Sequence, residues 1–335
     1  MTVVPGRFAC MTRYHHVGRS ILRRLLAFLS RCRVVLAGGV ALVAVTGCGG
    51  SAPASGPAHP PAVTSATTSP SAASGAVSGS APAVVPRPAH TVVVVMENHS
   101  YGQVIGNPAA PFINQLARSG ALFTRSLAVT HPSQPNYLAL FSGSTQGVTD
   151  DSCPHTFAAP NLAAGLARAG MSFAGYAEDL PATGSLVCSQ GQYARKHVPW
   201  TNFSNVPGSV SKPFTSWPSG DYAGLPTVSF VIPNLCNDMH DCDVAVGDAW
   251  LRAHISAYAD WAMSHDSLLI LTWDENDDSP GNQITTIMAG QLVKPGRYAE
   301  PITHYNVLAT IETAYALPRT GQAATAPQIT DIWAQ

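Results

Sequence analysis

Charged side chains are scarce in this 335-residue sequence. Asp, Glu, Lys and Arg together make up 11% of it, and the formal net charge is −1. The one basic block is an arginine cluster near the N-terminus, formed by Arg19, Arg23, Arg24, Arg31 and Arg33. Because nucleic-acid binding relies on clustered Lys and Arg in the folded domain, the composition argues against a nucleic-acid partner.

The sequence also lacks an apolar run long enough to span a bilayer. The run Val34–Val45 falls short of the ~20 residues that a spanning helix needs. A basic region, a short apolar region and small residues before Cys48 are typical of an export signal. Val45-Thr46-Gly47-Cys48 resembles a lipobox, whose cysteine becomes lipid-modified and N-terminal. We therefore predict a lipoprotein-type signal over residues 1–47, a membrane anchor at Cys48 and a location outside the cytoplasm, with plain secretion as the alternative.

Residues 48–88 are almost entirely Ser, Ala, Pro, Gly, Val and Thr. Such a composition buries too little apolar surface to offset the entropy of ordering the chain. We predict a disordered tether here, with a cleavable spacer as the alternative. The folded domain is expected over residues 89–318, followed by a C-terminal tail over residues 319–335.

Cysteine is rare as well. Of seven cysteines, Cys10 and Cys32 belong to the signal and Cys48 is the predicted lipid site, which leaves four: Cys153, Cys188, Cys236 and Cys242. Four cysteines allow three pairings, and the sequence does not choose among them. We favour Cys153–Cys188 and Cys236–Cys242, since the second pair brackets a short turn. A zinc site is the alternative, but an oxidising compartment favours disulfides.

Short apolar runs alternate with helical patterns across the domain. The β-branched run Thr91–Met96 suits a buried strand of a parallel sheet. Further strands are predicted over residues 123–129, 171–176, 227–232, 267–273 and 284–289. Helices are predicted over residues 111–118, 137–141, 161–168, 244–264 and 303–315. This alternation predicts one α/β domain with a mainly parallel sheet.

Polar residues follow several of these strands directly. They are Glu97, Asn98 and His99 after the first strand, Ser133 after the second, Asp238 and His240 after 227–232, Asp274, Glu275, Asp277 and Asp278 after 267–273, and His304 at the start of the last helix. Each alone is explained by the turn preference of its residue type. Because the carboxyl ends of parallel strands meet at one edge, where open α/β sheets bind ligands, the set predicts a functional site.

The residue types in this set suit metal-assisted hydrolysis. Carboxylate and amide oxygens favour Ca²⁺, Mg²⁺ or Mn²⁺, while the histidines keep zinc or iron as alternatives. A bound cation lowers the pKa of a coordinated hydroxyl and neutralises charge on a phosphoryl oxygen. Ser133 is then the candidate nucleophile, and His240 or His304 the candidate proton donor.

Five short motifs occur in a fixed order between residues 90 and 318. They are Glu97-Asn98-His99-Ser100-Tyr101, His131-Pro132-Ser133-Gln134-Pro135-Asn136-Tyr137, Asn237-Asp238-Met239-His240-Asp241, Trp273-Asp274-Glu275-Asn276-Asp277-Asp278 and Ile302-Thr303-His304-Tyr305. The first resembles the ENxSF-type opening of the bacterial phosphoesterase family that contains phospholipase C and acid phosphatases. The fourth resembles the DE-containing motif of the same family, and the other three complete the pattern of its compact members.

The resemblance implies a fold and a set of roles. The fold is a three-layer α/β/α sandwich of the alkaline phosphatase type, and the activity is phosphate-ester hydrolysis through a phosphoserine on Ser133. The implied ligands of one or two divalent metals (Ca, Mg, Mn or Zn) are Glu97, Asn98, Ser133, Asp238, Asp274 and Glu275. Asn136 matches a position that contacts the substrate phosphate, and His197 is a second substrate-binding candidate. His240 and His304 are implied as acid/base or second-metal residues.

Two departures from the family pattern refine the prediction. The phospholipase C members carry a DH pair shortly after the DE motif, whereas Asp277-Asp278-Ser279-Pro280 contains no His, and their large additional domains have no counterpart here. We therefore predict a phosphatase or phosphodiesterase, with phospholipase C-type cleavage as the alternative. A sulfate or phosphonate hydrolase is a further alternative, although the turn around Ser133 does not resemble the sulfatase modification motif. An inactive surface-binding lipoprotein is the alternative from another class, although every expected residue type is present.

Overall fold

The structure is a computed structural model that describes residues 84–334. The predicted export signal, the lipid site Cys48 and nearly all of the predicted tether lie outside the described residues. Val85 is already buried in the core, so ordered packing begins slightly before residue 89. Within the described part of the chain, no helix combines the length and the apolar character that crossing a bilayer requires.

A nine-stranded sheet forms the centre of the domain, in the order β10-β2-β9-β8-β1-β7-β3-β6, with β11 paired to β2. Its strands are β1 (Thr91–Met96), β2 (Ala121–Leu127), β3 (Phe173–Ala177), β6 (Ser211–Pro213), β7 (Val228–Ile232), β8 (Leu268–Trp273), β9 (Gln283–Ala289), β10 (Gly296–Tyr298) and β11 (Ile302–Thr303). A separate two-stranded sheet pairs β4 (Ser189–Gln190) with β5 (Tyr193–Ala194).

Most strand pairs are parallel, which confirms the prediction of a mainly parallel sheet. β1 pairs in parallel with β7 and β8, and β3 pairs in parallel with β6 and β7. β9 is antiparallel to both β2 and β8, so β2 runs in the same direction as β8. The carboxyl ends of β1, β2, β3, β7 and β8 therefore meet at one edge of the sheet.

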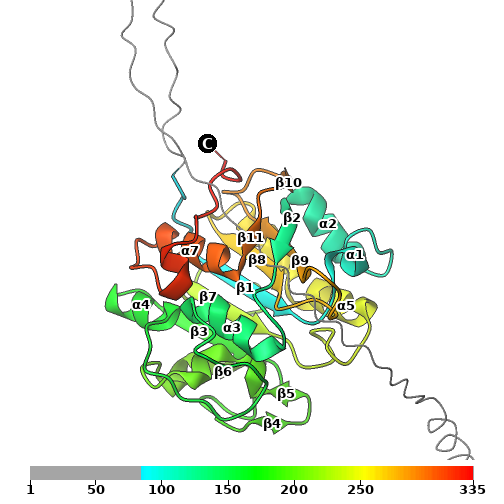
Figure 1. Cartoon of the computed structure of the whole chain (residues 1–335). Helices are drawn as coiled ribbons and strands as arrows, with labels where there is room; N and C mark the ends of the chain where they lie inside the picture. Colours follow the sequence, from blue (N-terminus) through cyan, green and yellow to red (C-terminus); the bar gives the residue numbers. More distant parts are fainter. Residues whose placement is uncertain (1–83, 335) are drawn as a thin grey trace, which may run out of the picture. The chain divides into compact units, whose positions relative to one another are not determined.

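Helices cover both faces of the sheet and give the predicted three layers. They are α1 (Tyr101–Val104), α2 (Pro111–Ser119), α3 (Ser133–Ser142), α4 (Leu162–Arg168), α5 (Val244–His254), α6 (Ser256–Ala262) and α7 (His304–Ala314). Side chains of α2, α5 and α6 share a core with Val92 and Val94, whereas those of α3, α4 and α7 share the other core with Val93 and Val95. Figure 1 shows α2 and α5 on one side of the sheet and α3, α4 and α7 on the other. Because successive side chains of a strand point to opposite faces, the wholly apolar β1 contributes to both cores.

The predicted single helix over residues 244–264 is wrong. The structure contains two helices, α5 and α6, which are separated at Ile255, where φ is −114°. Ile255 is nevertheless buried, and Leu251 and Tyr258 on either side of it enter the same core. The apolar periodicity continues across the break because both helices use the same buried face, and for this reason the sequence pattern does not reveal it.

The region around Ser133 also differs from its prediction. β2 ends at Leu127 rather than residue 129, and α3 begins at Ser133 rather than Tyr137. The backbone N–H groups of Val129 and Thr130 donate to Asn136 Oδ1 at 3.0 and 3.1 Å, so a side chain satisfies them in place of a neighbouring strand. Pro135 fits inside the first turn of α3, where the missing N–H costs no intrahelical hydrogen bond.

Two irregular segments complete the domain. The segment between β3 and β7 contains the short 3-10 helices η1 (Arg195–His197), η2 (Pro199–Asn202), η3 (Gly208–Val210) and η4 (Phe214–Ser216). The segment after α7 contains η5 (Gly321–Ala324) and buries Ile329, Ile332 and Trp333 against the core. Disulfide bonds join Cys153 to Cys188 and Cys236 to Cys242, the pairing that the sequence analysis favours.

Candidate active site

The candidate active site forms where β1 and β8 end side by side. Met96 is in register with Trp273, and the N–H of Asp274 donates to the carbonyl of Met96 at 2.9 Å. Glu97 and Asp274 therefore leave the sheet together. The backbone of Asn98 turns sharply, with φ of 49°, and its N–H donates to Asp274 Oδ1 at 3.4 Å. Backbone pairing in the sheet thus fixes the first acidic residues of the site.

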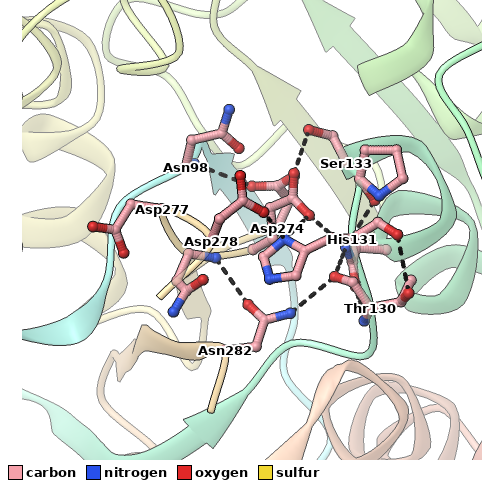
Figure 2. Close-up of polar contacts among 12 residues, drawn as sticks. Asn98, Thr130, His131, Ser133, Asp274, Asp277, Asp278 and Asn282 are labelled. Atoms are coloured by element: carbon pink, nitrogen blue, oxygen red, sulfur yellow. Dashed lines mark hydrogen bonds and ion pairs between the residues drawn. The ribbon is translucent and has the colours of Figure 1, made fainter. Parts of the chain in front are cut away.

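Ser133 reaches these carboxylates from the first position of α3. Its Oγ lies 3.1 Å from Glu97 Oε2 and 3.0 Å from Glu275 Oε1, with hydrogen-bond geometry to both. Figure 2 shows Asn98, Asp274, Ser133 and His131 around one centre, although they come from three separate segments. The structure therefore brings the proposed nucleophile into direct contact with two of the predicted metal ligands.

A buried chain of polar groups lies beneath Ser133. Tyr137 donates a hydrogen bond to Glu97 Oε1, and His197 Nε2 lies 3.1 Å from the same oxygen. The other ring nitrogen of His197, Nδ1, lies 3.3 Å from Asp238 Oδ2. The His197 ring stacks on Tyr137 at 5.1 Å. His197 is 1% exposed, so it connects two carboxylates inside the protein rather than lining an open surface.

The site concentrates negative charge away from water. Glu97, Asp238, Asp274 and Glu275 are all at most 5% exposed. Burial raises the pKa of the Glu97, Asp238 and Asp274 carboxyls well above their ordinary values; repulsion from Asp238 raises that of Glu97 further, and repulsion from Glu97 raises that of Asp274. Burial also raises the pKa of Glu275. Buried carboxylates of this kind are stable as anions only when cations compensate them.

The unsatisfied polar atoms of the site match a metal-binding role. Among the described residues, Asn98 Oδ1 and Asp274 Oδ2 are buried without a hydrogen-bond partner, and the close contacts of His197 Nε2 and Asp238 Oδ2 lack hydrogen-bond geometry. Ligand atoms of Glu97, His197 and His240 also lie within 4.8 Å of one another. Buried carboxylates normally pair with other groups or coordinate metals, so the residues present fit a divalent cation.

The two predicted acid/base histidines differ in their surroundings. His304 is 1% exposed; its Nε2–H donates to the Asp274 carbonyl at 2.6 Å, and Nδ1 has no partner among the described residues. Burial lowers the pKa of His304 to about 4, which leaves it neutral near pH 7. The His240 side chain is 26% exposed, and its Nδ1 lies 2.7 Å from Asp241 Oδ1. Only His240 of this pair lies at the open rim.

Asn136 and His131 organise the turn that precedes Ser133. Besides accepting from two backbone N–H groups, Asn136 donates through Nδ2 to the carbonyls of Thr130 and Pro132 at 2.8 and 3.2 Å. His131 Nδ1 lies 2.7 Å from Glu275 Oε2 and 3.3 Å from Asp278 Oδ1, the contact visible in Figure 2. The Asn136 amide is thus engaged within the protein, and the contact with the substrate that the family resemblance implies for it stays a prediction.

Three further residues of the site have no role in the sequence analysis: Tyr137, Asp151 and Lys196. Lys196 Nζ donates to Asp151 Oδ2 at 2.8 Å and lies 3.3 Å from His240 Nε2. Burial alone would lower the pKa of Lys196, but its hydrogen bond to Asp151 and the charge of Glu97 raise the pKa, so the ammonium stays charged. Tyr137 belongs to the sequence motif around Ser133, and that motif could have identified it as a residue of the site. Asp151 lies in a loop and Lys196 in the short 3-10 helix η1, and no periodicity indicates the position of either residue.

The fold and the site define the class of the protein as a hydrolase built on a three-layer α/β/α sandwich. Residues 107–318 match the model of the Phosphoesterase family, and the chain belongs to that family. It is therefore an enzyme that hydrolyses phosphoric ester bonds, which confirms the resemblance noted in the sequence.

Two relatives illustrate this membership. The chain is 58% identical over 255 residues to phosphatidylinositol-3-phosphatase of Mycobacterium tuberculosis, in an alignment that covers 76% of this chain and 85% of the relative. It is 30% identical over 228 residues to the phosphate-repressible acid phosphatase of Penicillium chrysogenum, covering 63% of this chain and 55% of the relative. The chain thus spans about half the length of the fungal acid phosphatases that it matches.

Solved structures support the fold. A protein of the alkaline phosphatase superfamily from Vibrio parahaemolyticus aligns with a TM-score of 0.52 and 13% identity, over 74% of this chain and 72% of that one. The lipoteichoic acid synthase LtaP from Listeria monocytogenes aligns with a TM-score of 0.53 and 11% identity, over 74% of this chain and 76% of that one.

Proposed function

We propose that this protein is a metal-dependent phosphatase that hydrolyses phosphate monoesters through a phosphoserine formed on Ser133. One observation carries the proposal: the Ser133 hydroxyl contacts Glu97 and Glu275 at 3.1 and 3.0 Å inside a cluster of buried carboxylates that have unpartnered oxygens. A hydroxyl held in this way is placed for nucleophilic attack beside a cation.

The residues divide into two sets of candidate ligands. Glu97, Asn98, Ser133, Asp274 and Glu275 offer only oxygen atoms, which suits Mg²⁺, Ca²⁺ or Mn²⁺. A second position next to Glu97 is surrounded by imidazole nitrogens of His197 and His240, which suits Zn²⁺ or Mn²⁺, and Asp238 contacts the other ring nitrogen of His197. When bound, a divalent cation lowers the pKa of the hydroxyl and offsets charge on the phosphoryl oxygens. His197 fits this second set better than the substrate contact predicted from the sequence, because it is buried beneath Glu97.

The chemistry then follows two displacements. Ser133 gives its hydroxyl proton to the Glu275 carboxylate 3.0 Å away, and its Oγ attacks the phosphorus atom. The bond between phosphorus and the ester oxygen breaks, and the departing oxygen takes a proton from water. Water is the proton donor of the proposal, because neither histidine is free to donate. His240 belongs to the second ligand set and its Nε2 faces the Lys196 ammonium, and His304 is buried, neutral near pH 7 and engaged through Nε2 with the Asp274 carbonyl. A water molecule then attacks the phosphoserine from the vacated side, the bond between phosphorus and Ser133 Oγ breaks, and Oγ takes back the proton from Glu275, which releases inorganic phosphate and restores the hydroxyl.

The substrate class is proposed from the relatives. The mycobacterial relative is named for removal of a phosphate from phosphatidylinositol 3-phosphate, and the fungal relatives are named as acid phosphatases. Both names describe the hydrolysis of a phosphate monoester. We propose the same bond type here, with an inositol-lipid monoester as the substrate to test first. The two disulfides fit an oxidising compartment, and attachment to the membrane through Cys48 stays a prediction.

The experiment compares ester types on the purified, metal-loaded protein and on Ser133→Ala. Phosphatidylinositol 3-phosphate and p-nitrophenyl phosphate should be hydrolysed, whereas bis(p-nitrophenyl) phosphate, p-nitrophenyl sulfate and phosphatidylcholine should react far more slowly. Ser133→Ala should lose at least about 1,000-fold in kcat while keeping the fold. A Ser133→Ala protein with full activity would overturn the nucleophile assignment, and faster cleavage of the diester or of phosphatidylcholine would overturn the monoester assignment.

A further inference from the structure

The proposed reaction needs a positively charged side chain that binds the substrate phosphate, and no residue has yet been given this role. A phosphate monoester approaches as an anion, yet the site consists mainly of carboxylates: Glu97, Asp238, Asp274 and Glu275 are buried there, and Asp151 lies at the rim. Cations held by the buried carboxylates can neutralise only the side of the substrate that faces them. The oxygens on the open side need a positive group from the protein, because like charges in a poorly hydrated site repel strongly.

Lys196 is placed where such a group is needed. The chain has three lysines, Lys196, Lys212 and Lys294. Of these, Lys196 lies in η1 directly before His197, and its Nζ lies 3.3 Å from His240 Nε2. Its side chain is 20% exposed, whereas His197 is almost completely buried. The ammonium thus lies at the boundary between the buried carboxylates and solvent.

The hydrogen bonds of Lys196 leave capacity for a ligand. An ammonium carries three N–H donors. One donates to Asp151 Oδ2 at 2.8 Å, and a second faces His240 Nε2 at 3.3 Å. No further acceptor contacts Nζ among the described residues, so the third N–H remains for an incoming oxygen.

Asp151 connects this ammonium to the nucleophile. Its Oδ1 accepts from the backbone N–H of Gln134 at 3.0 Å, and Gln134 follows Ser133 in the first turn of α3. The same carboxylate therefore binds Lys196 with one oxygen and the helix start with the other. This arrangement ties the ammonium to the start of the helix that carries Ser133.

We propose that Lys196 binds a non-bridging oxygen of the substrate phosphoryl group, and that Asp151 is the residue that positions it. The inference rests on the proposed function, because it assigns a partner to the phosphate that Ser133 attacks. The alternative is a purely structural ion pair between Lys196 and Asp151, which binds no ligand.

The test measures inorganic phosphate binding by calorimetry on metal-loaded Ser133→Ala, which needs no turnover. Lys196→Met removes the charge but keeps the length of the side chain, Lys196→Arg keeps the charge, and Lys294→Met is the matched control at an exposed position. Lys196→Met should weaken phosphate binding at least about 10-fold, the loss expected for one charge-assisted hydrogen bond. Lys196→Arg should recover part of it, and Lys294→Met should bind as the parent protein does.

Steady-state kinetics on the active protein, in which Ser133 is unchanged, give the second readout. Lys196→Met should lower kcat/KM about 100-fold and raise the inhibition constant of inorganic phosphate, with unchanged metal content and melting temperature. Asp151→Asn should show a smaller loss of the same kind. Unchanged phosphate affinity in folded, metal-loaded Lys196→Met would overturn the proposal. If the parent protein hydrolysed no monoester, the proposed function would fail, while the calorimetric comparison would still decide whether Lys196 binds phosphate.

Discussion

Tyr137 donates a hydrogen bond to Glu97 from a position one helical turn beyond Ser133. Ser133 contacts one oxygen of the Glu97 carboxylate and Tyr137 contacts the other. Because residues four apart lie on the same face of a helix, α3 offers two donors to a single carboxylate. Burial and the charge of Glu97 raise the pKa of Tyr137 well above its ordinary value, so the phenol stays protonated and keeps donating. The register of α3 therefore fixes the orientation of Glu97.

Tyr137→Phe should separate this orienting role from packing. The ring, its stacking on His197 and its volume remain, while Glu97 loses one donor. We expect kcat to fall roughly 10-fold, and the free energy of unfolding to fall by about 1–3 kcal/mol because a buried acceptor is left unsatisfied. Steady-state kinetics, metal analysis and thermal unfolding measure these effects. Tyr298→Phe, which removes a hydroxyl bonded to the Lys294 carbonyl at an exposed edge, is the control and should keep full activity.

Metal removal should destabilise the protein more at high pH than at low pH. Burial raises the pKa of Glu97, Asp238 and Asp274 in the metal-free protein, so the folded state binds more protons than the unfolded state above the ordinary carboxyl range. The stability of the metal-free protein therefore falls as pH rises. Metal binding needs the same carboxylates deprotonated, so it strengthens as pH rises.

The measurement compares melting temperatures of metal-loaded and chelator-treated protein at pH 5.5, 6.5 and 8. The difference between the two forms should grow with pH, and Asp274→Asn should reduce both the difference and the metal content. A difference that stays constant across this range would contradict a carboxylate-bound cation. Titratable groups far from the site affect both forms equally and therefore cancel.

Removal of the two disulfides should affect activity and stability to different extents. Cys236–Cys242 closes a short loop that carries Asp238 and His240, whereas Cys153–Cys188 joins residues 35 apart. Loop-closure entropy predicts roughly 2 kcal/mol of stabilisation for the first and roughly 4 kcal/mol for the second. Replacing both cysteines of Cys236–Cys242 with Ser should mainly reduce activity, and the same change at Cys153–Cys188 should mainly lower the melting temperature. Activity and thermal unfolding are measured on both variants. Full activity without Cys236–Cys242 would show that other contacts hold the short loop in place.

Much of the site could be predicted because strand ends are a local signal. An apolar run followed directly by Glu97, and another followed by Asp274 and Glu275, indicated both the strands and the edge at which they meet. The backbone pairing of β1 with β8 then placed these residues together without any contribution from the loops. Ser133 and Asn136 were recognised from their motif, but the start of α3 was not, since two prolines obscured the helical pattern.

The remaining part of the site depends on contacts distant in sequence. Lys196 and His197 lie in a segment of short 3-10 helices, where no periodicity reveals which side chains point inward. His197 enters the site because its ring stacks on Tyr137, sixty residues earlier in the chain, and lies between Glu97 and Asp238. A single sequence carries no local signal for such a contact, so the buried role of His197 emerged only from the fold.

A buried carboxyl outside the active site provides a last, independent test. Glu312 on α7 is 1% exposed and accepts hydrogen bonds from the N–H and the hydroxyl of Thr320, the hydroxyl at 2.7 Å. Burial raises the pKa of Glu312 from 4.5 to about 7. The folded state then holds this proton between about pH 4.5 and 7 while the unfolded state releases it, so the contribution of Glu312 to stability is lost as pH rises through this window.

Glu312→Gln, a neutral side chain of similar shape, should remove this pH dependence. The slope that Glu312 adds to the free energy of unfolding is at most about 1.4 kcal/mol per pH unit in that window. Urea unfolding of metal-loaded protein at pH 5, 6, 7 and 8 should therefore show a flatter profile for the variant, which gains stability relative to the parent as pH rises. Parallel profiles for the two proteins would mean that Glu312 is already ionised at pH 5, and that its hydrogen bonds from Thr320 outweigh the cost of burying its charge.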